Sequence, residues 1–589
     1  MIKKFKIPAV IKEKFRFSTL SFLFIITYVN IFQFIFGPEN SIVGVIFTIM
    51  MSASMVRDLT AAPLRHFFIQ SAVLVWMAFA ACLVAILPAL PGFAVNFITL
   101  SLILYAYTYE YSSHLYFPYI LSYLFLVFIS PVDLEHLPMR LLGMLTGAVS
   151  IIVYQLFMGR KRVAETAKDV LNEMIDDICQ MISFRLGQTQ EPPDFTETRQ
   201  RLCRLSQTVY DRRKKILCVS DASFSMIDAG RGLENLLLLV SELPAELSSG
   251  ERALLVETAD RLDTFHDYLS HGNGKIAEIT LGGIPGSSGD SASLEHTGNA
   301  AGSDHTADSE DIKTIRTFYH ALSYIRNKLL HMSDPRHRIH YRKTALSLKL
   351  QFQAALDYSP VRAVYAIRTA LLLSFATLLV LSLELPHGKW LMFTLASVSL
   401  PYADDVPVKI KKRVLATLIG GVISVMIYSL VPSPAGRTAA MMLSGYISFY
   451  LSDYMETFAC STIGALGGAV FMNSFGLQAV GSIFLIRICY ILAGVMIGYL
   501  ANCLIFPYSR SKATEQLWKR YVTITELLAQ ICRSKTADAQ LYYNLVIQAP
   551  LLEEKLSANA ALEEWEDGPA LLAQCRDKVR QAHRIHPPA

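Results

Sequence analysis

The sequence has few charged residues for its length, and the shortage is concentrated in two long segments. Of the 589 residues only 17% are charged, whereas soluble proteins carry about 25%. Residues 17–158 contain eight charged side chains and residues 361–506 contain fourteen. Two apolar blocks of this kind exclude a single soluble globule and a disordered chain. They predict an all-α, polytopic helical membrane protein with substantial water-exposed domains.

Signatures of common enzymes and metal sites are missing as well. The nine cysteines form no CxxC pair and no Cys/His spacing typical of a metal site, so we expect free thiols in a reducing compartment. The sequence contains no GxxxxGK[ST] phosphate loop, no HExxH and no GxSxG. We therefore expect no enzyme activity, no cofactor and no metal. ATP-driven pumping by this chain alone is disfavoured, and nucleic acid is not an expected partner.

Each apolar block divides into segments of helix length. A spanning α-helix needs about 20 mostly apolar residues, and we expect six such helices in each block. In the first block they are 17–36, 41–56, 67–89, 92–109, 115–130 and 139–158. In the second block they are 361–383, 388–402, 414–431, 436–450, 455–473 and 479–506. The first segment is too long for the core of a signal peptide and has no small-residue cleavage site, which favours a retained helix.

Lysine and arginine concentrate in alternate loops, which predicts the orientation in the membrane. The basic segments are residues 3–16, 57–65, 160–162, 409–413 and 510–512. If all twelve helices span, these segments lie on one side, so both termini and the central segment are cytosolic. The prediction is a multi-pass protein of a bacterial inner (plasma) membrane.

The same pattern divides the chain into four domains. Residues 1–158 and 361–506 are the two six-helix membrane blocks, 159–360 a cytosolic helical domain, and 507–589 a cytosolic helical tail. Within the central domain, residues 281–304 are rich in Gly, Ser and small polar residues, which predicts a flexible linker.

Four pairs of residues recur in the same order in the two blocks, which predicts an internal repeat. The pairs are Arg16 with Arg368, Asp58 with Asp405, Glu110 with Asp453, and Arg140 with Arg487. Because each block has an even number of helices, the copies form a parallel repeat related by an axis along the membrane normal. We expect binding or conduction at the interface between the copies.

Three features of the second block are typical of a known family. They are Arg368 in an apolar helix, the segment Pro-His-Gly-Lys-Trp at 386–390, and a basic loop that runs into Gly420 and Gly421. In these features the block resembles the fusaric acid resistance-like family, which includes aromatic acid exporters. The resemblance is good over 361–506 and weaker over 17–158. More distantly, the layout is similar to the plant malate-channel family.

The resemblance implies a secondary transporter that exports aromatic or other organic anions, with a periplasmic adaptor as a partner. Proton coupling would supply the driving force. Two other functions remain open, namely a passive anion channel and a non-transport envelope protein that scaffolds or senses. A homo-oligomer is compatible with each of the three.

Export of an organic anion needs positive charge along the route, because a buried, unpaired anion is costly. Arg368, Arg487 and Arg140 are the candidates for the substrate path, since each lies in an apolar segment. The alternative for each is a structural role, in which the side chain reaches a lipid headgroup or pairs with a carboxylate.

Proton coupling needs a carboxylate that changes its protonation during the cycle. The candidates are Asp58, Asp405, Glu110 and Asp453, which recur in both blocks near helix ends. Helix caps or loop ion pairs explain them equally well.

Overall fold

The described part of the chain is entirely helical. The structure, a computed structural model, describes residues 9–54, 63–108, 116–159, 162–212, 219–271, 276–277, 305–340, 359–431, 433–451, 453–472, 477–533 and 538–585. These residues form 21 α-helices and no strand, which confirms the all-α fold class. The chain folds into two compact units. The membrane unit comprises Met1–Phe157 and Tyr358–Gln516, and the second unit comprises Met158–Asp357 and Leu517–Ala589.

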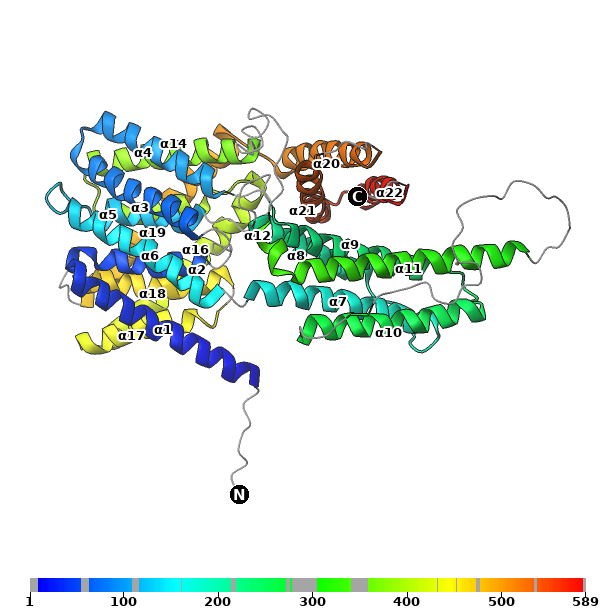
Figure 1. The fold of residues 1–589 in the computed structure, drawn as a ribbon. Coiled ribbons are helices and arrows are strands. Elements are labelled where there is room, and N and C mark those ends of the chain that lie inside the picture. The colour runs from blue at the N-terminus through cyan, green and yellow to red at the C-terminus, as the bar shows by residue number, and fades with distance from the viewer. Residues whose placement is uncertain are drawn as a thin grey trace, which may run out of the picture. The chain divides into compact units, whose positions relative to one another are not determined.

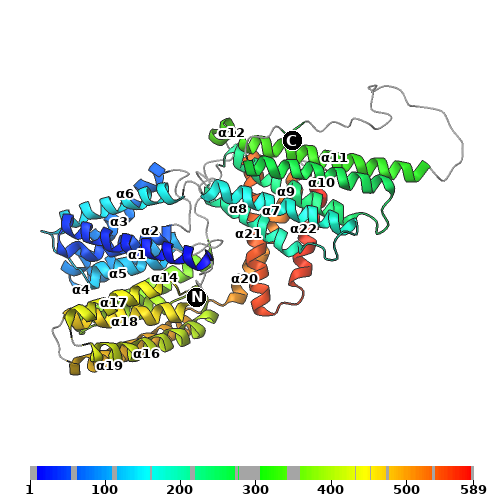
Figure 2. The same ribbon diagram turned by 90° about the horizontal axis from the view of Figure 1, so that it is seen from below.

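Each of the twelve apolar segments expected from the sequence contains one α-helix, and these helices run alongside one another in the membrane unit (Figure 2). The first block contains α1 (Ala9–Phe36), η1 (Pro38–Asn40), α2 (Ser41–Ser54), α3 (Pro63–Ile86), α4 (Ala89–Tyr107), α5 (Tyr116–Phe128) and α6 (Leu137–Gly159). The second contains α14 (Pro360–Ser382), α15 (Lys389–Val398), η2 (Ala403–Asp405), α16 (Val406–Leu430), α17 (Pro434–Ser448), α18 (Tyr454–Met472), α19 (Leu477–Leu500) and η3 (Ala501–Ile505).

Seven helical segments within the described residues are long and apolar enough to cross a membrane. They are Phe15–Phe36, Pro63–Ile86, Ala89–Tyr107, Leu137–Phe157, Pro360–Ser382, Ala403–Leu430 and Gly481–Ile505. Large apolar side chains cover their outer surfaces, and Phe34 is 91% exposed and Phe157 85% exposed. Such a surface is suited to lipid, so this is a multi-pass membrane protein. The shorter apolar helices α5 and α15 lie among the long ones, and a full set of twelve spans stays a prediction.

The basic segment 409–413 is not a loop, and this part of the prediction is wrong. Helix α16 already begins at Val406, directly after η2, with Pro407 in its first turn. Proline is favoured there because its fixed φ suits a helix and its missing N–H costs no intrahelical bond. The positive charges at 409–413 therefore occupy the first two turns of a long helix, and Arg413 is buried.

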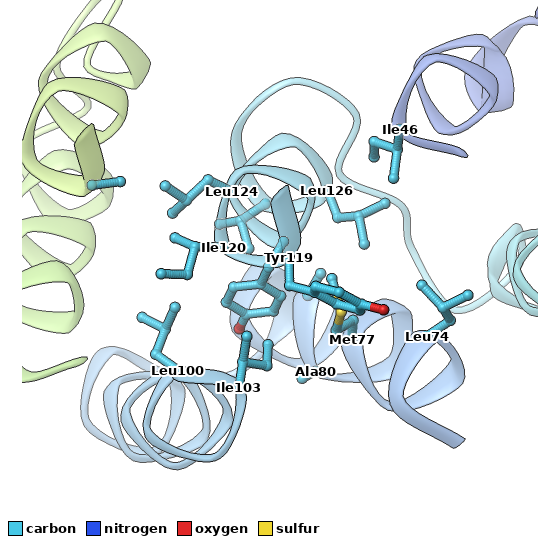
Figure 3. Packing of buried hydrophobic residues seen from close by; sticks show 14 of the residues in the cluster. Ile46, Leu74, Met77, Ala80, Leu100, Ile103, Tyr119, Ile120, Leu124 and Leu126 are labelled. Atoms are coloured by element: carbon cyan, nitrogen blue, oxygen red, sulfur yellow. The ribbon is translucent and has the colours of Figure 1, made fainter. Parts of the chain in front are cut away.

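The two membrane blocks share one apolar core. Buried residues of α3, α4 and α5 interdigitate in the first block (Figure 3), and the cluster continues to Leu373 on α14 and Leu395 on α15. Helix α4 packs along α14, where the rings of Phe93 and Phe375 lie 4.9 Å apart. The seam between the blocks is therefore largely filled with apolar and aromatic side chains.

Two glycines bring the last helix of each block close to the second helix of that block. A Cβ on Gly147 of α6 would come within 2.0 Å of Phe47 on α2, and one on Gly494 of α19 within 3.0 Å of Thr394 on α15. The shift in numbering that takes Arg140 to Arg487 also takes Gly147 to Gly494 and Phe47 to Thr394. The parallel repeat itself stays a prediction.

The second unit is a bundle of amphipathic helices (Figure 1). Its helices are α7 (Arg162–Arg185), α8 (Phe195–Arg212), α9 (Asp221–Glu242), α10 (Ser249–His271), α11 (His305–Ser333), α12 (Pro335–Ile339), most of α20 (Arg510–Arg533), α21 (Ala539–Glu563) and α22 (Gly568–Ile585). Apolar side chains such as Leu171, Leu233 and Phe265 fill its interior. The expected linker at 281–304 lies outside the described residues.

One carboxyl group in the second unit is poised to titrate near neutral pH. Glu553 of α21 accepts hydrogen bonds from Arg576 Nη1 at 2.7 Å, Arg199 Nη1 at 3.4 Å and the Tyr521 hydroxyl at 3.2 Å. Burial raises the pKa of Glu553 to about 7, against the pull of Arg199 and with a further increase from the charge of Glu234.

The second unit should therefore lose stability as the pH rises. The folded state holds the Glu553 proton more tightly than the unfolded chain does, so the stabilisation is complete below the ordinary glutamate pKa. It is lost as the pH rises through about 7, at a cost on the order of 3 kcal/mol. Glu553→Gln should flatten this dependence when unfolding of the full-length protein is followed by tryptophan fluorescence between pH 5 and 8.5, whereas the exposed Glu554→Gln should not. Equal pH dependence in both variants would show that another group is responsible.

Candidate functional site

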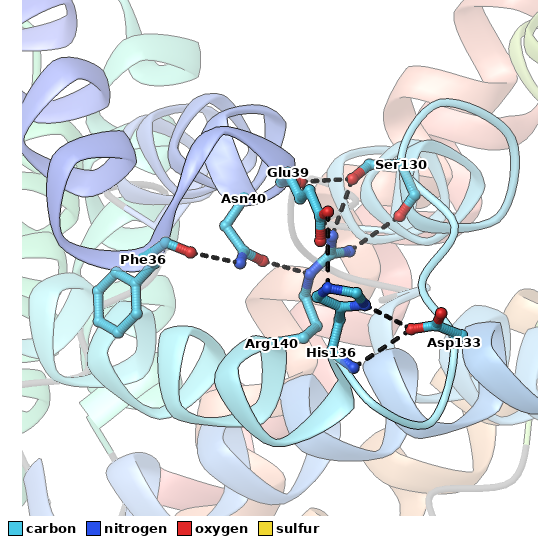
Figure 4. A network of polar contacts seen from close by, with 7 residues as sticks. All are labelled: Phe36, Glu39, Asn40, Ser130, Asp133, His136 and Arg140. Atoms are coloured by element: carbon cyan, nitrogen blue, oxygen red, sulfur yellow. Dashed lines mark hydrogen bonds and ion pairs between the residues drawn. The ribbon is translucent and has the colours of Figure 1, made fainter.

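Arg140 connects two loops of the first block through hydrogen bonds (Figure 4). It lies in the first turn of α6 and is 1% exposed. Its Nε donates to Asn40 Oδ1 at 2.5 Å, Nη1 donates to the Ser130 carbonyl at 3.0 Å, and Nη2 donates to the Glu39 carbonyl at 3.0 Å and to Ser130 Oγ at 2.8 Å. Because these acceptors lie beyond the C-terminal ends of α1 and α5, Arg140 supplies donors where the helices leave carbonyls unpaired.

Neighbouring side chains strengthen the same junction. The amide nitrogen of Asn40 donates to the carbonyl of Phe36, the last residue of α1, at 2.8 Å. His136 lies 2.6 Å from Asp133 and 3.8 Å from the Glu39 carboxylate (Figure 4). The first of the three predicted path arginines is thus placed in a network that holds helix ends together.

Arg368 is also surrounded by backbone carbonyls. It lies on α14, is 3% exposed, and donates to the carbonyls of Phe506 at 2.9 Å, Leu400, and Pro401 at 3.4 Å. These carbonyls follow the C-terminal ends of η3 and α15, where the helix dipole favours a positive charge. Arg368 therefore joins three segments of the second block, and this contact set favours the structural alternative.

Arg487 has a different environment. It lies midway along α19 and is 6% exposed, with its guanidinium 5.1 Å from the centre of the Trp390 ring. Its Nε and Nη1 atoms are buried and have no hydrogen-bond partner among the described residues. Stacking on an aromatic face compensates only part of the cost of burying a cation.

Arg413 is a second buried cation, which the sequence reasoning missed as a site residue. It is 4% exposed on α16, its guanidinium lies 4.2 Å from the centre of the Phe458 ring, and its Nε has no partner within the described ranges. Its helix packs against α19, which carries Arg487. The signal that could have found it is the unbroken apolar run that follows it, which places it inside a helix.

Tyr454 and Lys409 extend this group of polar side chains towards the start of α16. The Tyr454 hydroxyl is buried with no partner among the residues that the structure describes, and its ring lies 4.3 Å from that of Phe458. Lys409 Nζ lies 3.3 Å from the centre of the Tyr454 ring. Lys409, Arg413 and Arg487 thus form a series of cations lined by aromatic rings, which we call the arginine–aromatic cluster.

The carboxylates that the sequence nominated for proton coupling occur in ion pairs where they are described. Asp405 pairs with Arg510, and Asp453 lies 2.9 Å from Lys412 and accepts a hydrogen bond from the Met455 amide at 2.8 Å. The hydrogen bond from Lys412 lowers the pKa of Asp453, which favours its ionised form. Asp58 and Glu110 lie outside the described residues, so proton coupling stays a prediction.

The fold and the cluster define a multi-pass helical membrane protein with buried cations in its second block. Residues 374–501 match the family model described as fusaric acid resistance protein-like, which confirms the resemblance over this stretch. No curated protein and no solved structure matches the chain. The entire arginine–aromatic cluster lies within the matched stretch, whereas Arg140 and Arg368 lie outside it.

Proposed function

We propose that this protein is a secondary transporter that exports organic anions, of which aromatic acids are one class, across a bacterial inner membrane. The observation that carries the proposal is the buried, incompletely paired guanidinium of Arg487 in an apolar helical bundle. A guanidinium keeps its charge in proteins, so it needs water, a carboxylate or another anion beside it. Within the described residues no carboxylate forms an ion pair with Arg487 or Arg413. A transported anion fits this position.

The family match supports a transporter-like membrane protein, and the driving force belongs to the proposal. Antiport of protons would use the cytosolic carboxylates Asp58, Asp405, Glu110 and Asp453. A periplasmic adaptor and a homo-oligomer are further parts of the proposal, as the family resemblance implies for the adaptor.

The parallel repeat also belongs to the proposal, and two pairs of contacts support it. The first helix of each block touches the fourth helix of the other, since α14 packs on α4 and Thr19 of α1 lies 2.8 Å from the Tyr446 hydroxyl of α17. The paired contacts of Gly147 with Phe47 and Gly494 with Thr394 relate the blocks in the same register. A rotation about the membrane normal would produce both correspondences.

The proposed topology places both termini on the cytosolic side. The hydrogen bonds of Arg140 require the loops at Glu39 and Ser130 to lie at the same end of the bundle. In a variant without native cysteines, Glu39→Cys, Glu135→Cys and Ser433→Cys should react with an impermeant thiol reagent from outside the cell, and Ser511→Cys should not. Protection of the first three together with labelling of Ser511→Cys would invert the topology.

Transport into proteoliposomes tests the function. With an imposed pH gradient, the purified protein should accumulate benzoate or phthalate above its equilibrium distribution, and collapse of the gradient should release the excess. Transport that only follows the anion's own electrochemical gradient would indicate the passive channel instead. Folded protein that moves neither anion would contradict the proposal and favour the scaffolding or sensing alternative.

A further inference from the structure

Arg140 and Arg487, which correspond in the proposed repeat, differ in their hydrogen-bond acceptors. At the numbering shift that takes Arg140 to Arg487, Asn40 corresponds to His387 and Ser130 to Leu477. The amide oxygen and the hydroxyl that accept hydrogen bonds from Arg140 therefore have no equivalent side-chain acceptor around Arg487. His387 instead stacks on Trp390, with ring centroids 4.9 Å apart, and the Arg487 guanidinium lies 5.1 Å from the centre of the same Trp390 ring.

Several donors of the second block without a partner in the described structure belong to the helices of this cluster, and others, among them Arg368 Nε, lie on α14. Arg487 contributes two buried nitrogens without a partner in the described part of the chain, Arg413 contributes one, and Tyr454 contributes a hydroxyl. They come from three helices, α19, α16 and α18. The guanidinium of Arg413 lies over the Phe458 ring, and that of Arg487 lies over the Trp390 ring. Aromatic faces fix the position of a guanidinium and leave its N–H groups available in the plane.

The positive charge of the cluster predicts the charge of the ligand that it would bind. Both guanidinium groups are positively charged, the helices α16 and α19 that carry them pack together, and neither group is within ion-pair distance of a carboxylate among the described residues. A single negative charge would leave one of the two cations uncompensated, whereas a dianion would pair with both. Carboxylates suit guanidinium groups because each can accept two parallel N–H bonds.

We infer that the arginine–aromatic cluster is a binding site for a planar organic dianion, located inside the second block among α15, α16, α18 and α19. The inference rests on the proposed transport of organic anions and specifies its site and charge preference. It differs from the location expected from the repeat, because the seam between the blocks at α4 and α14 is packed with apolar side chains. Lys409, half-buried near the start of α16, provides the positive entry to this site.

Calorimetric titration of the full-length protein in nanodiscs tests the site without requiring transport. The probes are phthalate, an aromatic dianion, its monoanionic counterpart benzoate, and neutral benzamide. Phthalate should bind about tenfold or more tightly than benzoate, because the second carboxylate meets the second guanidinium. Benzamide should show no saturable binding.

Charge-removing variants locate the site. Arg487→Gln and Arg413→Gln should each weaken phthalate binding by about tenfold or more and bring it close to that of benzoate. Lys411→Gln removes the same charge from an exposed position on α16 and should change neither. If a glutamine variant does not fold, the corresponding lysine variant keeps the charge and should bind phthalate more weakly than the wild type does, with the dianion still preferred.

Several outcomes would overturn the inference. They are equal affinity for benzoate and phthalate, no saturable phthalate binding by the folded protein, and wild-type binding by both glutamine variants. Loss of phthalate binding in phosphatidylglycerol but not in phosphatidylcholine nanodiscs would assign the cluster to a lipid headgroup. Phthalate binding that depends on Arg487 and Arg413, without any transport, would refute the proposed function but support the site. Transport that neither glutamine variant affects would refute the site but support the proposed function.

Discussion

Replacing Arg140 with alanine should remove most of the folded protein from the membrane. The substitution would leave the Ser130 carbonyl and the Asn40 amide oxygen without their donor, whereas the Glu39 carbonyl would keep the Ser130 hydroxyl. Each unsatisfied acceptor costs about 1–3 kcal/mol, so we expect a loss of roughly 2 kcal/mol or more. Because the two loops join the ends of α1 and α5 to their neighbours, the packing of the whole first block depends on this residue.

The measurement is the amount of monodisperse protein in detergent and its melting temperature. Arg437→Ala is a suitable control, since this half-buried arginine in the first turn of α17 donates through Nε to the Val431 carbonyl, only six residues away. It should lower the melting temperature much less. Normal yield and stability of Arg140→Ala, together with lost transport, would place Arg140 on the substrate path instead.

Replacing Arg487 with glutamine should reduce transport and leave the stability of the protein intact, in contrast to Arg140→Ala. Transport of phthalate should fall by about 100-fold, because the substrate loses a buried charge partner that water cannot replace in an apolar bundle. Stability should be unchanged or higher, since Nε and Nη1 of Arg487 have no hydrogen bonds in the described structure to lose. A buried cation that is retained at a cost in stability is typical of a functional site.

Initial rates in proteoliposomes and melting temperatures of the same preparations check this prediction. Lys411→Gln serves as the control for a change of net charge on the same face of the membrane. Undiminished transport by a well-folded Arg487→Gln protein would remove Arg487 from the mechanism. A sharp loss of stability would instead give it the structural role that we assign to Arg140.

The sequence was sufficient to locate the twelve α-helices that the structure describes in the two apolar blocks, because a helix in lipid must be apolar over most of its length. It was insufficient at α16, where the positive charges at 409–413 suggested a loop. In the fold, those charges occupy the first turns of the helix, and only Arg413 turns inward to full burial. The composition of a short basic segment does not reveal which of its side chains is buried and which are exposed.

The roles of the arginines depended on contacts that span long sequence separations. Arg140 finds its acceptors about one hundred residues away, at Glu39 and Asn40, and Arg368 finds one at Phe506. Backbone carbonyls carry no sequence signature, so these structural roles could not be distinguished from transport roles beforehand. The sequence placed Arg487 in an apolar segment, and its role on the substrate path stays a prediction, whereas its association with Arg413 required the packing of α16 against α19.

The most direct test of the account is an experimental structure of the full-length protein with 4-iodophthalate bound. We expect density for the ligand inside the second block, with its two carboxylates facing Arg413 and Arg487 and its ring beside Trp390 or Phe458. Density for the iodinated ring in the seam between α4 and α14, or at Arg140, would contradict it.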